Sequence, residues 1–510
     1  MKLFKLLFSR LGITLMLVVL EIVYFISLLQ WLSPYIGWVT GVLQVASVFI
    51  ILWIINRSRH LSADMMWIVL IFLAPIPGTI VYAMLSTIGK FPSRTYRNIM
   101  AETQNCQYLF EQDEEVLEEA CDSAGPYAGQ INYISQTAGF PVYHNEGFDY
   151  YSSGEEAYPL MLHELRAAKE FIFIEYFIIK EGRMWNGILN ILRDKAAQGV
   201  DVRVIYDDFG SISTLPYRYA DNLEKNGIKT ISFNRVNPFL NGIQNHRDHR
   251  KILVVDGRVA FTGGINLADE YINLKERFGY WKDNVVRVKG DAVWSFTLMF
   301  LTMWNALRKE DDDFSLFRSD EEIASVNPAD GWIAPYGETP LDDVNVGQNI
   351  YENILNQAKD YCYIFTPYLI IDTDMINALI MAANRGVDVR IITPGIPDKK
   401  LIYNITRSFY NQLILGGVKI YEYTPGFIHS KVFVCDDRIA TVGTLNLDYR
   451  SLYLHFENGI YLCDSADVLT VKQDVIDTLN VSHHVSLEES RHNLLHTLIF
   501  SIVRIFAPLM

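Results

Sequence analysis

One pattern of residues occurs twice in the chain, and it constrains the fold more than any other feature. A histidine is followed two residues later by a lysine, then by an aspartate, a glycine and an asparagine, and all five recur at a constant offset of 180 residues. The first three alone would match roughly 0.03 times by chance in a chain of ordinary composition. Two complete copies therefore indicate an internal duplication. The sets are His249, Lys251, Asp256, Gly263 and Asn266, and His429, Lys431, Asp436, Gly443 and Asn446.

The sequence around each copy repeats as well. An apolar run, a helical pattern that ends in a glycine and a β-branched run follow one another in both halves. Strand, helix and strand in alternation predict an α/β sheet covered by helices. We expect two α/β/α sandwich halves, 146–330 and 331–485, in a pseudo-two-fold arrangement around one cleft. The segments are 171–177, the pattern ending at Gly199 and 200–206 in the first half, and 361–365, the pattern ending at Gly386 and 387–392 in the second.

Two histidines facing one cleft suit a displacement at phosphorus. A neutral imidazole can attack phosphorus and form a covalent phosphohistidine, while the other imidazole, protonated, donates to the leaving alkoxide. Lys251, Lys431, Asn266 and Asn446 would supply the positive charge and the N–H donors that the oxyanion needs. This chemistry needs no metal and no other cofactor, and no carboxylate cluster with metal-ligand spacing accompanies the motifs.

An imidazole in this role needs a carboxylate that orients its second nitrogen. Asp283 lies 34 residues after His249, and Glu457 lies 28 residues after His429, each at the start of a strand-like segment. We expect these two carboxylates to be the acceptors for those histidines. A surface carboxylate without such a role is the simpler alternative for either residue.

Charge and cysteine content exclude some classes of protein. The chain has 44 basic and 59 acidic residues, a net charge of −15. Nucleic acid is a disfavoured partner because its affinity for proteins comes mostly from Lys and Arg that neutralise phosphates. The five cysteines are odd in number and form no CxxC or Cys/His cluster, so we expect free thiols without zinc or a redox role.

The first 90 residues are predicted to be a membrane region. Residues 11–32 and 36–55 are apolar runs of about 20 residues, the length that crosses a hydrocarbon core. Basic residues flank the pair, so the positive-inside rule predicts a transmembrane hairpin with both ends in the cytoplasm. A signal peptide is disfavoured because a second run follows directly. The third run, 65–85, contains Pro75-Ile76-Pro77-Gly78 and is expected to be bent, re-entrant or interfacial.

Two other segments flank the halves. Six of the nine residues from Glu111 to Glu119 are acidic, which predicts a solvated linker or helix face within residues 91–145. Residues 486–510 have apolar side chains at helical spacing and predict an amphipathic helix. This helix could lie on a membrane surface or pack on the core, and the sequence does not decide between them.

The paired motifs resemble the phospholipase D superfamily, and the runs around them resemble bacterial cardiolipin synthases within it. Those runs are 248–251, 426–431 and 443–451, with 206–211 and 366–368 in support. The resemblance implies six active-site residues: His249, Lys251, Asp256, His429, Lys431 and Asp436. It also implies the conversion of two phosphatidylglycerols into cardiolipin and glycerol. One departure is His455, which stands where the resemblance leads us to expect asparagine.

With the resemblance to bacterial enzymes, the predicted hairpin leads us to expect a multi-pass protein of the bacterial cell membrane, and the positive-inside rule favours a catalytic part on the cytoplasmic side. A phospholipase D or a phosphatidylserine synthase is the nearest alternative, since only the acceptor hydroxyl differs. A nuclease is disfavoured by the charge and the hydrophobic hairpin. A non-catalytic scaffold is disfavoured because both motif sets are complete. The oligomeric state stays open.

Overall fold

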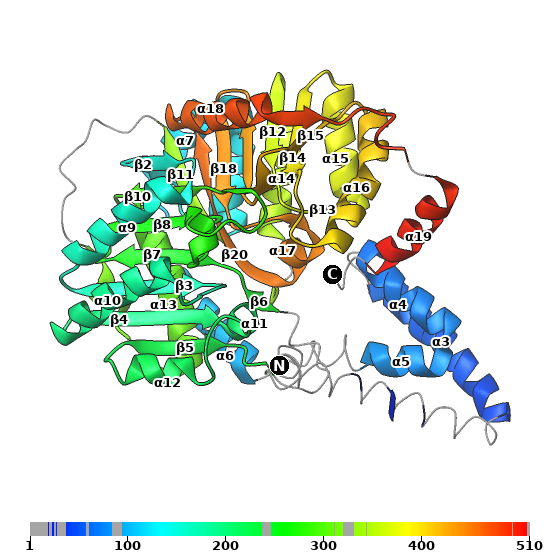
Figure 1. Cartoon of the computed structure of the whole chain (residues 1–510), viewed down its shortest axis with the longest axis horizontal. Helices are drawn as coiled ribbons and strands as arrows, with labels where there is room; N and C mark the ends of the chain where they lie inside the picture. Colours follow the sequence, from blue (N-terminus) through cyan, green and yellow to red (C-terminus); the bar gives the residue numbers. More distant parts are fainter. Residues whose placement is uncertain are drawn as a thin grey trace.

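The computed structural model describes residues 37–57, 61–83, 94–236, 246–310, 312–319, 331–342, 344–491 and 493–506, together with Val19, Val23, Tyr24 and Ser27. Two β-sheets with helices on their faces form the body, and a small group of helices lies to one side of it (Figure 1). The predicted mixed α/β fold with two related halves is confirmed.

The first sheet has seven strands in the order β2-β10-β8-β7-β3-β4-β5. The last three strands of this order are parallel, and all other neighbours are antiparallel. Every residue of β3 and β7 is buried, which is why these runs are almost continuously apolar rather than alternating. The strands are β2 Phe148–Tyr151, β3 Phe171–Tyr176, β4 Asp201–Asp207, β5 Lys229–Phe233, β7 Lys251–Val255, β8 Val259–Gly263 and β10 Val285–Lys289.

The second sheet has the order β1-β11-β20-β18-β17-β12-β14-β15-β21, with β6 also paired to β20. Its strands β12, β14 and β15 are parallel, as β3, β4 and β5 are in the first sheet. The duplication in sequence is thus a duplication in topology. The strands are β1 Tyr143–His144, β6 Arg247–Asp248, β11 Trp332–Glu338, β12 Tyr361–Phe365, β14 Asp388–Pro394, β15 Lys419–Tyr423, β17 Val432–Cys435, β18 Ile439–Gly443, β20 His455–Cys463 and β21 Ser482–His484.

Helices cover the outer faces of both sheets, and the inner faces share one apolar core with α13 and α18. The predicted helix ends are confirmed, because Gly199 and Gly386 follow α10 and α15 at φ of 92° and 96°, a left-handed conformation that glycine adopts without strain. The helices are α9 Gly154–Ala167, α10 Arg183–Ala197, α12 Tyr219–Glu224, α13 Val293–Arg308, α14 Val346–Gln357, α15 Thr373–Asn384, α16 Lys400–Leu415, α17 Tyr449–Tyr453 and α18 Asp467–Asn480.

The segment predicted as an acidic linker is folded onto the body. α6 (Arg94–Cys106) packs against α13 and buries Tyr96 and Ile99. α7 (Glu114–Ala124) buries Leu117 in the core of the second half, while its glutamates are exposed. The acidic run is therefore the solvated face of a packed helix, and the segment is not a free linker.

The N-terminal helices are α3 (Gly37–Arg57), α4 (Leu61–Leu73) and α5 (Pro75–Tyr82), which share a small apolar cluster. Within the described residues, no helix combines the length and the apolar character needed to cross a bilayer. The first predicted span, residues 11–32, lies outside the described residues except for four single positions. The transmembrane hairpin therefore stays a prediction.

The third hydrophobic run is bent, as the sequence predicts. Ala74 separates α4 from α5 with φ −140° and ψ 77°, and the prolines around it cannot donate backbone hydrogen bonds. A Cβ atom on Gly78 would lie 2.5 Å from the Leu70 carbonyl oxygen, so the turn brings the backbone too close for any other residue.

The predicted C-terminal amphipathic helix is α19 (Leu494–Ile505), which lies between α16 and α4 (Figure 1). Phe500 and Val503 pack against the core of the second half, while Ile505 and Phe506 pack against the cluster of the N-terminal helices. α19 therefore joins the body to those helices. It still exposes the apolar side chains of Leu498, Ile499 and Ile502.

Candidate active site

Two short strand pairings between the halves build the site. β6 runs parallel to the start of β20, and β16 (Gly426–Ile428) runs parallel to β9 (Tyr280–Lys282). A motif histidine follows each short strand. The His249 N–H donates to the Phe456 carbonyl at 2.8 Å, and the His429 N–H donates to the carbonyl of Lys282 at 2.7 Å. Each histidine is thus held by the backbone of the opposite half.

A buried carboxylate lies at Nδ1 of each imidazole. His249 Nδ1 is 2.7 and 2.9 Å from the two oxygens of Glu457, and His429 Nδ1 is 2.7 Å from Asp283 Oδ2. Both carboxylates are fully buried. Such a partner fixes the tautomer that carries its proton on Nδ1 and leaves the Nε2 lone pair free. Both histidines are thereby prepared for attack or proton transfer through Nε2.

The carboxylates are the ones expected from the sequence, but each serves the histidine of the other half. The expected pairing of Asp283 with His249 and of Glu457 with His429 is wrong. The reason lies in the strands: β6 delivers His249 to β20, which carries Glu457, and β16 delivers His429 to the end of β9, where Asp283 follows. Distance along the chain gave no information about this exchange.

The two motif lysines are buried beside the histidines. The Lys251 ammonium donates to the His249 carbonyl oxygen at 2.7 Å, and Lys431 donates to the His429 carbonyl oxygen in the same way. Burial lowers the pKa of Lys251 to about 8 and that of Lys431 to about 7, although the carboxylates of Glu457 and Asp283 oppose this. An anion bound between the two ammonium groups would stabilise their charged forms.

The same burial keeps the imidazoles neutral in the absence of an anion. Burial and the charges of the two lysines hold the pKa of His249 well below its ordinary value. Burial and Lys431 lower the pKa of His429 to about 4, against the opposing effect of Asp283. A phosphodiester bound beside the lysines would offset their charge, and one imidazole could then hold a second proton.

The two motif asparagines also line the cleft. Asn266 accepts from the Ile178 N–H and donates to the Tyr271 hydroxyl, both at 2.9 Å. Asn446 donates to the Ser451 hydroxyl at 3.0 Å. An amide group has two N–H donors, so each asparagine is oriented by the protein through one of them.

Asp256 and Asp436 do not lie in the site, which corrects the expectation of six active-site residues. Each carboxylate accepts from three consecutive backbone N–H groups, those of residues 169–171 and 359–361 respectively, at 2.8 or 2.9 Å. Asp256 follows the far end of β7. At roughly 3.3 Å per strand residue, its Cα atom lies about 16 Å along the strand from the Cα atom of Lys251. The regular spacing of the motif reflects the strand that joins the site to this structural turn.

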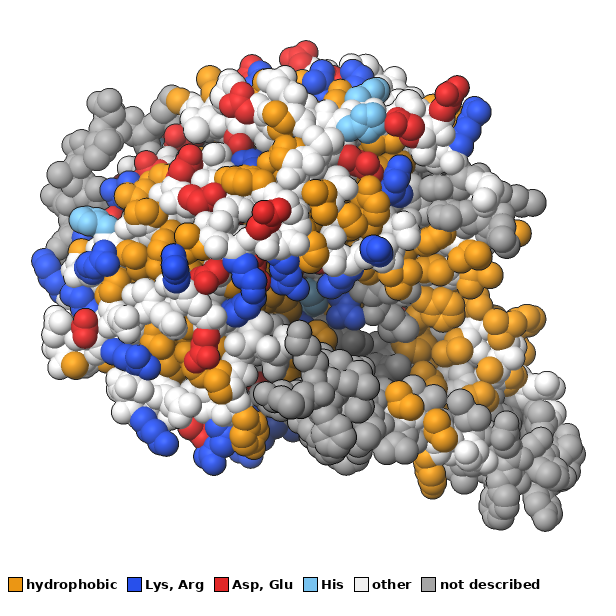
Figure 2. Space-filling view, viewed as in Figure 1, with side chains coloured by type: hydrophobic (Ala, Val, Ile, Leu, Met, Phe, Trp, Pro, Cys, Tyr) orange, Lys and Arg blue, Asp and Glu red, His pale blue; other side chains and the backbone are white. Residues whose placement is uncertain are grey.

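The cleft is a cavity of about 470 Å³ with aromatic and basic walls. Lys and Arg side chains gather in a band across the middle of the face shown in Figure 2. The sequence interpretation missed four basic lining residues, Arg247, Arg277, Lys399 and Arg450. Arg247 and Arg450 are close to the motifs and could have been found there, whereas Arg277 and Lys399 lie between motifs and carry no signal. The aromatic lining residues are Phe177, Phe209, Tyr271, Phe278, Trp281, Tyr368 and Phe427.

Only one trio of potential metal ligands occurs in the part of the chain that the structure describes. His249, His455 and Glu457 place one donor atom each within 4.8 Å of one another. Glu457 is already the hydrogen-bond acceptor for His249, so a metal here would displace the proton on which the imidazole's orientation depends.

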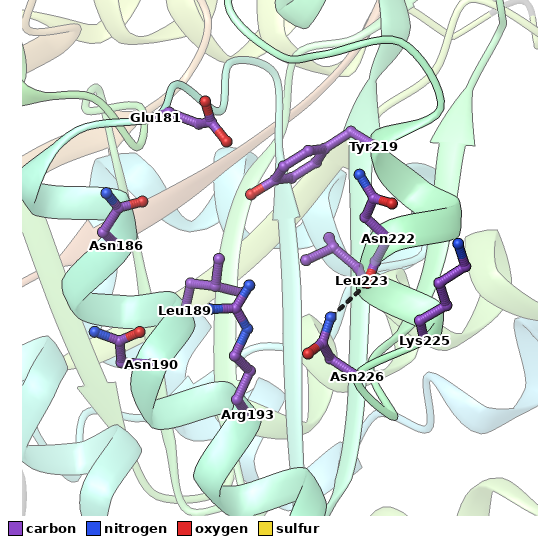
Figure 3. A pocket seen from close by; sticks show the side chains of 10 residues that line it. All are labelled: Glu181, Asn186, Leu189, Asn190, Arg193, Tyr219, Asn222, Leu223, Lys225 and Asn226. Carbon is purple, nitrogen blue, oxygen red and sulfur yellow. Dashed lines mark hydrogen bonds between the residues drawn. The ribbon is translucent and has the colours of Figure 1, made fainter.

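A second cavity, of about 540 Å³, lies on the outer face of the first half between α10 and α12 (Figure 3). Asparagines dominate its wall, and Asn226 donates to the Asn222 carbonyl oxygen at 2.6 Å. No motif residue lines this cavity, so it is not the candidate active site.

Replacing Asp436 with alanine should destabilise the fold more than it slows the chemistry. The substitution removes the acceptor for three backbone N–H groups and for the Tyr127 hydroxyl. Because the turn is partly solvated, we expect a loss of about 2–4 kcal/mol in the free energy of unfolding, measured by urea denaturation. A hundredfold loss of activity at unchanged stability would contradict this structural role.

The contribution of Asp436 to the free energy of unfolding should also depend on pH. Burial raises its pKa, but the backbone N–H bonds outweigh burial and lower it below the ordinary value. A depressed carboxyl pKa stabilises the fold at pH above about 4, the unfolded value, and this stabilisation is lost as the pH falls through the folded-state pKa. The pH dependence of unfolding should therefore be shallower at acidic pH in Asp436→Ala than in the wild type.

Because each carboxylate contacts the histidine of the other half, its mutation should affect that histidine and not the one in its own half. Glu457→Gln should perturb the ¹⁵N resonances of His249 and leave those of His429 in place, and Asp283→Asn should do the reverse. Each should reduce kcat by about 10²–10⁴-fold, the scale seen when an amide replaces the aspartate of a Ser-His-Asp triad. A Glu457→Gln spectrum in which only His429 shifts would refute the crossed pairing.

Comparison with known proteins agrees with this geometry. The family described as "Cardiolipin synthase, PLD-like domain" matches residues 161–290 and 351–479. A cardiolipin synthase of Alkalihalophilus pseudofirmus is 32% identical over 481 residues, which cover 93% of this chain and 95% of that protein. An uncharacterized protein of Streptococcus mutans is 45% identical over 464 residues, which cover 90% of this chain and 99% of that protein.

A solved structure shares the fold. The phosphatidylserine synthase of Haemophilus influenzae superposes with a TM-score of 0.54 at 15% identity, covering 72% of this chain and 96% of that one. At this identity the likeness concerns the fold alone. The family match and the similarity to cardiolipin synthases over most of the chain show that the chain belongs to the cardiolipin synthase family of the phospholipase D superfamily.

Proposed function

We propose that the protein is a cardiolipin synthase, which transfers the phosphatidyl group of one phosphatidylglycerol to another and releases glycerol. The observation that carries this proposal is the pair of crossed histidine–carboxylate dyads, whose histidines line one cavity, with two lysines buried beside them. The cavity joins basic groups for a phosphate to aromatic walls for the apolar part of a lipid.

In the first step, Nε2 of one imidazole attacks phosphorus, and the bond from phosphorus to the glycerol oxygen breaks. The other imidazole gives its proton to that oxygen, so glycerol leaves as a neutral alcohol. In the second step, a hydroxyl of another phosphatidylglycerol returns a proton to this imidazole and attacks phosphorus. The phosphorus–nitrogen bond breaks, and both histidines regain their starting states. The near symmetry of the dyads leaves open which histidine attacks.

Lys251 and Lys431 act on the charge that builds up on the phosphoryl oxygens. Both ammonium groups are fixed by carbonyl oxygens before substrate arrives, so little reorganisation is needed as the transition state forms. Asn266 and Asn446 lie at matching positions and would complete the set of donors. The bound phosphodiester itself would help one imidazole to hold the proton that the first step consumes.

We further propose that the N-terminal region attaches the enzyme to the bacterial cell membrane, with 11–32 and 36–55 as a transmembrane hairpin and the catalytic part on the cytoplasmic side. Hydrophobic side chains dominate the described surface of α3–α5 and α19, at the right of Figure 2. A phosphatidylglycerol donor and acceptor would then reach the enzyme from the lipid phase.

The proposed organisation along the chain follows from these roles. Residues 1–90 form the membrane region, and residues 91–145 connect it to the body. The first phospholipase D-like half occupies residues 146–330, and the second occupies 331–485. The C-terminal amphipathic helix falls within 486–510. Proteolysis of the detergent-solubilised protein, with fragments identified by mass spectrometry, would test these boundaries.

The choice of acceptor separates this proposal from its alternatives. Purified protein incubated with phosphatidylglycerol in vesicles should yield cardiolipin and free glycerol. Phosphatidic acid as the only lipid product would make it a phospholipase D, and phosphatidylserine formed on addition of serine would make it a phosphatidylserine synthase. Lipid mass spectrometry distinguishes the three products.

Either His249→Ala or His429→Ala should abolish synthesis, because one imidazole must attack while the other protonates the leaving glycerol. Removal of a nucleophile or a general acid costs orders of magnitude in rate. A single variant that keeps more than about a tenth of the wild-type rate would have lost only about 1.4 kcal/mol of transition-state stabilisation. That result would rule out the two-histidine mechanism.

A protein that lacks residues 1–86 should shift its products from cardiolipin towards phosphatidic acid. Water at about 55 M competes with the lipid acceptor for the phosphatidyl-enzyme, and confinement to a bilayer gives the acceptor a high effective concentration. The ratio of the two products on dispersed substrate measures the shift. An unchanged ratio in a protein that no longer binds vesicles would contradict the role given to the membrane.

A further inference from the structure

A third imidazole lies beside the reacting groups. His455 is the first residue of β20, two positions before Glu457, so both side chains project from the same face of the strand. Its ring centroid is 5.6 Å from that of His249, and its side chain lines the cavity. The mechanism proposed above uses the crossed dyads and the buried lysines, and it assigns no role to the His455 imidazole.

His455 is buried, yet neither ring nitrogen has a hydrogen-bond partner among the described residues. Glu457 Oε1 lies 3.6 Å from Nδ1 of His455, which is too far for a hydrogen bond. The Glu457 oxygens already accept from His249, Thr444 and Ser451. Buried polar groups in proteins are almost always paired, so the partner of His455 should come from the cavity.

The other half has a different residue at the equivalent place. Trp281 lies two positions before Asp283, as His455 lies two before Glu457, and its ring centroid is 5.5 Å from that of His429. The Trp281 indole N–H points to Asp283 Oδ2 at 3.4 Å. One side of the cavity is therefore aromatic with its donor occupied, whereas the side of His249 has an unoccupied imidazole.

The hydrogen-bonding groups of a neutral imidazole limit which chemical groups of a ligand can pair with His455. Burial lowers the pKa of His455 to about 4 despite the opposing effect of Glu457, so the ring offers one N–H donor and one nitrogen acceptor. An ionised phosphoryl oxygen can only accept and would leave the second nitrogen unpaired. A hydroxyl both donates and accepts, and the two adjacent hydroxyls of a glycerol headgroup can satisfy both nitrogens.

We propose that His455 determines headgroup specificity by hydrogen bonding the glycerol hydroxyls of phosphatidylglycerol on the His249 side of the cavity. This inference rests on the proposed function and names the group by which the substrate is recognised. It assigns the difference between His455 and Trp281 to recognition of the headgroup on the His249 side.

The test compares two donors that differ only in these hydroxyls. Phosphatidylglycerol and phosphatidylpropanol with the same acyl chains are mixed in the same vesicles, so that phosphatidylglycerol is the acceptor for both donors, and the ratio of kcat/KM for release of glycerol and of propanol is measured. The wild type should prefer phosphatidylglycerol by about tenfold or more, since a site that hydrogen-bonds a hydroxyl discriminates against its absence. Because the measurement is a ratio, the fraction of active enzyme cancels.

Apolar variants should remove this preference, and an amide should keep it. His455→Leu and His455→Phe, either of which suffices if it folds, are expected to reduce the ratio to within about twofold of one. His455→Asn retains a donor and an acceptor and should keep most of the preference. Trp281→Phe is the matched control at the equivalent position and should leave the ratio as in the wild type.

The outcomes separate the two proposals. A wild type that makes cardiolipin but shows no preference, or apolar variants that retain it, would overturn the role of His455 alone. Loss of the preference in Trp281→Phe as well would point to general disturbance of the cavity and overturn it too. A wild type that makes no cardiolipin from phosphatidylglycerol would overturn the proposed function, and this inference with it.

Discussion

Backbone pairing between the halves is the interaction on which the rest of the site depends. β6 beside β20 and β16 beside β9 are very short, yet they fix the position of both histidines and decide which carboxylate each one meets. The shared core of the two sheets holds these contacts in place. Neither half contains a complete dyad, so the chemistry requires both halves to be folded against each other.

The sequence was sufficient to predict the repeat and the α/β halves. The candidate histidines and lysines and the carboxylates of Asp283 and Glu457, which the sequence singled out, lie together in the structure. The sequence could not predict the exchange of those carboxylates, because contacts between duplicated units leave no trace in their spacing. It also placed Asp256 and Asp436 in the site, because a motif at a fixed spacing shows that its residues are constrained without showing whether chemistry or a structural turn constrains them.

The segment before the first half shows a different limit of sequence interpretation. An acidic run is typical of solvated chain, but the opposite side of the same helix is apolar, and Leu117 is buried in the second half. The preceding α6 packs on α13, which belongs to the first half. Residues that looked like a spacer therefore contact both halves and are a packed part of the body.

The crossed pairing has the form of an isologous interface, in which residue i of one unit meets residue j of the other and the reverse also holds. In a dimer of two identical chains with this interface, every substitution would occur at both ends of the cleft. When the two units are joined in one polypeptide, a substitution can occur at one end alone. One end of the cleft has Trp281 and the other has His455, so a site built on symmetric chemistry can handle two unlike parts of a lipid at the same time.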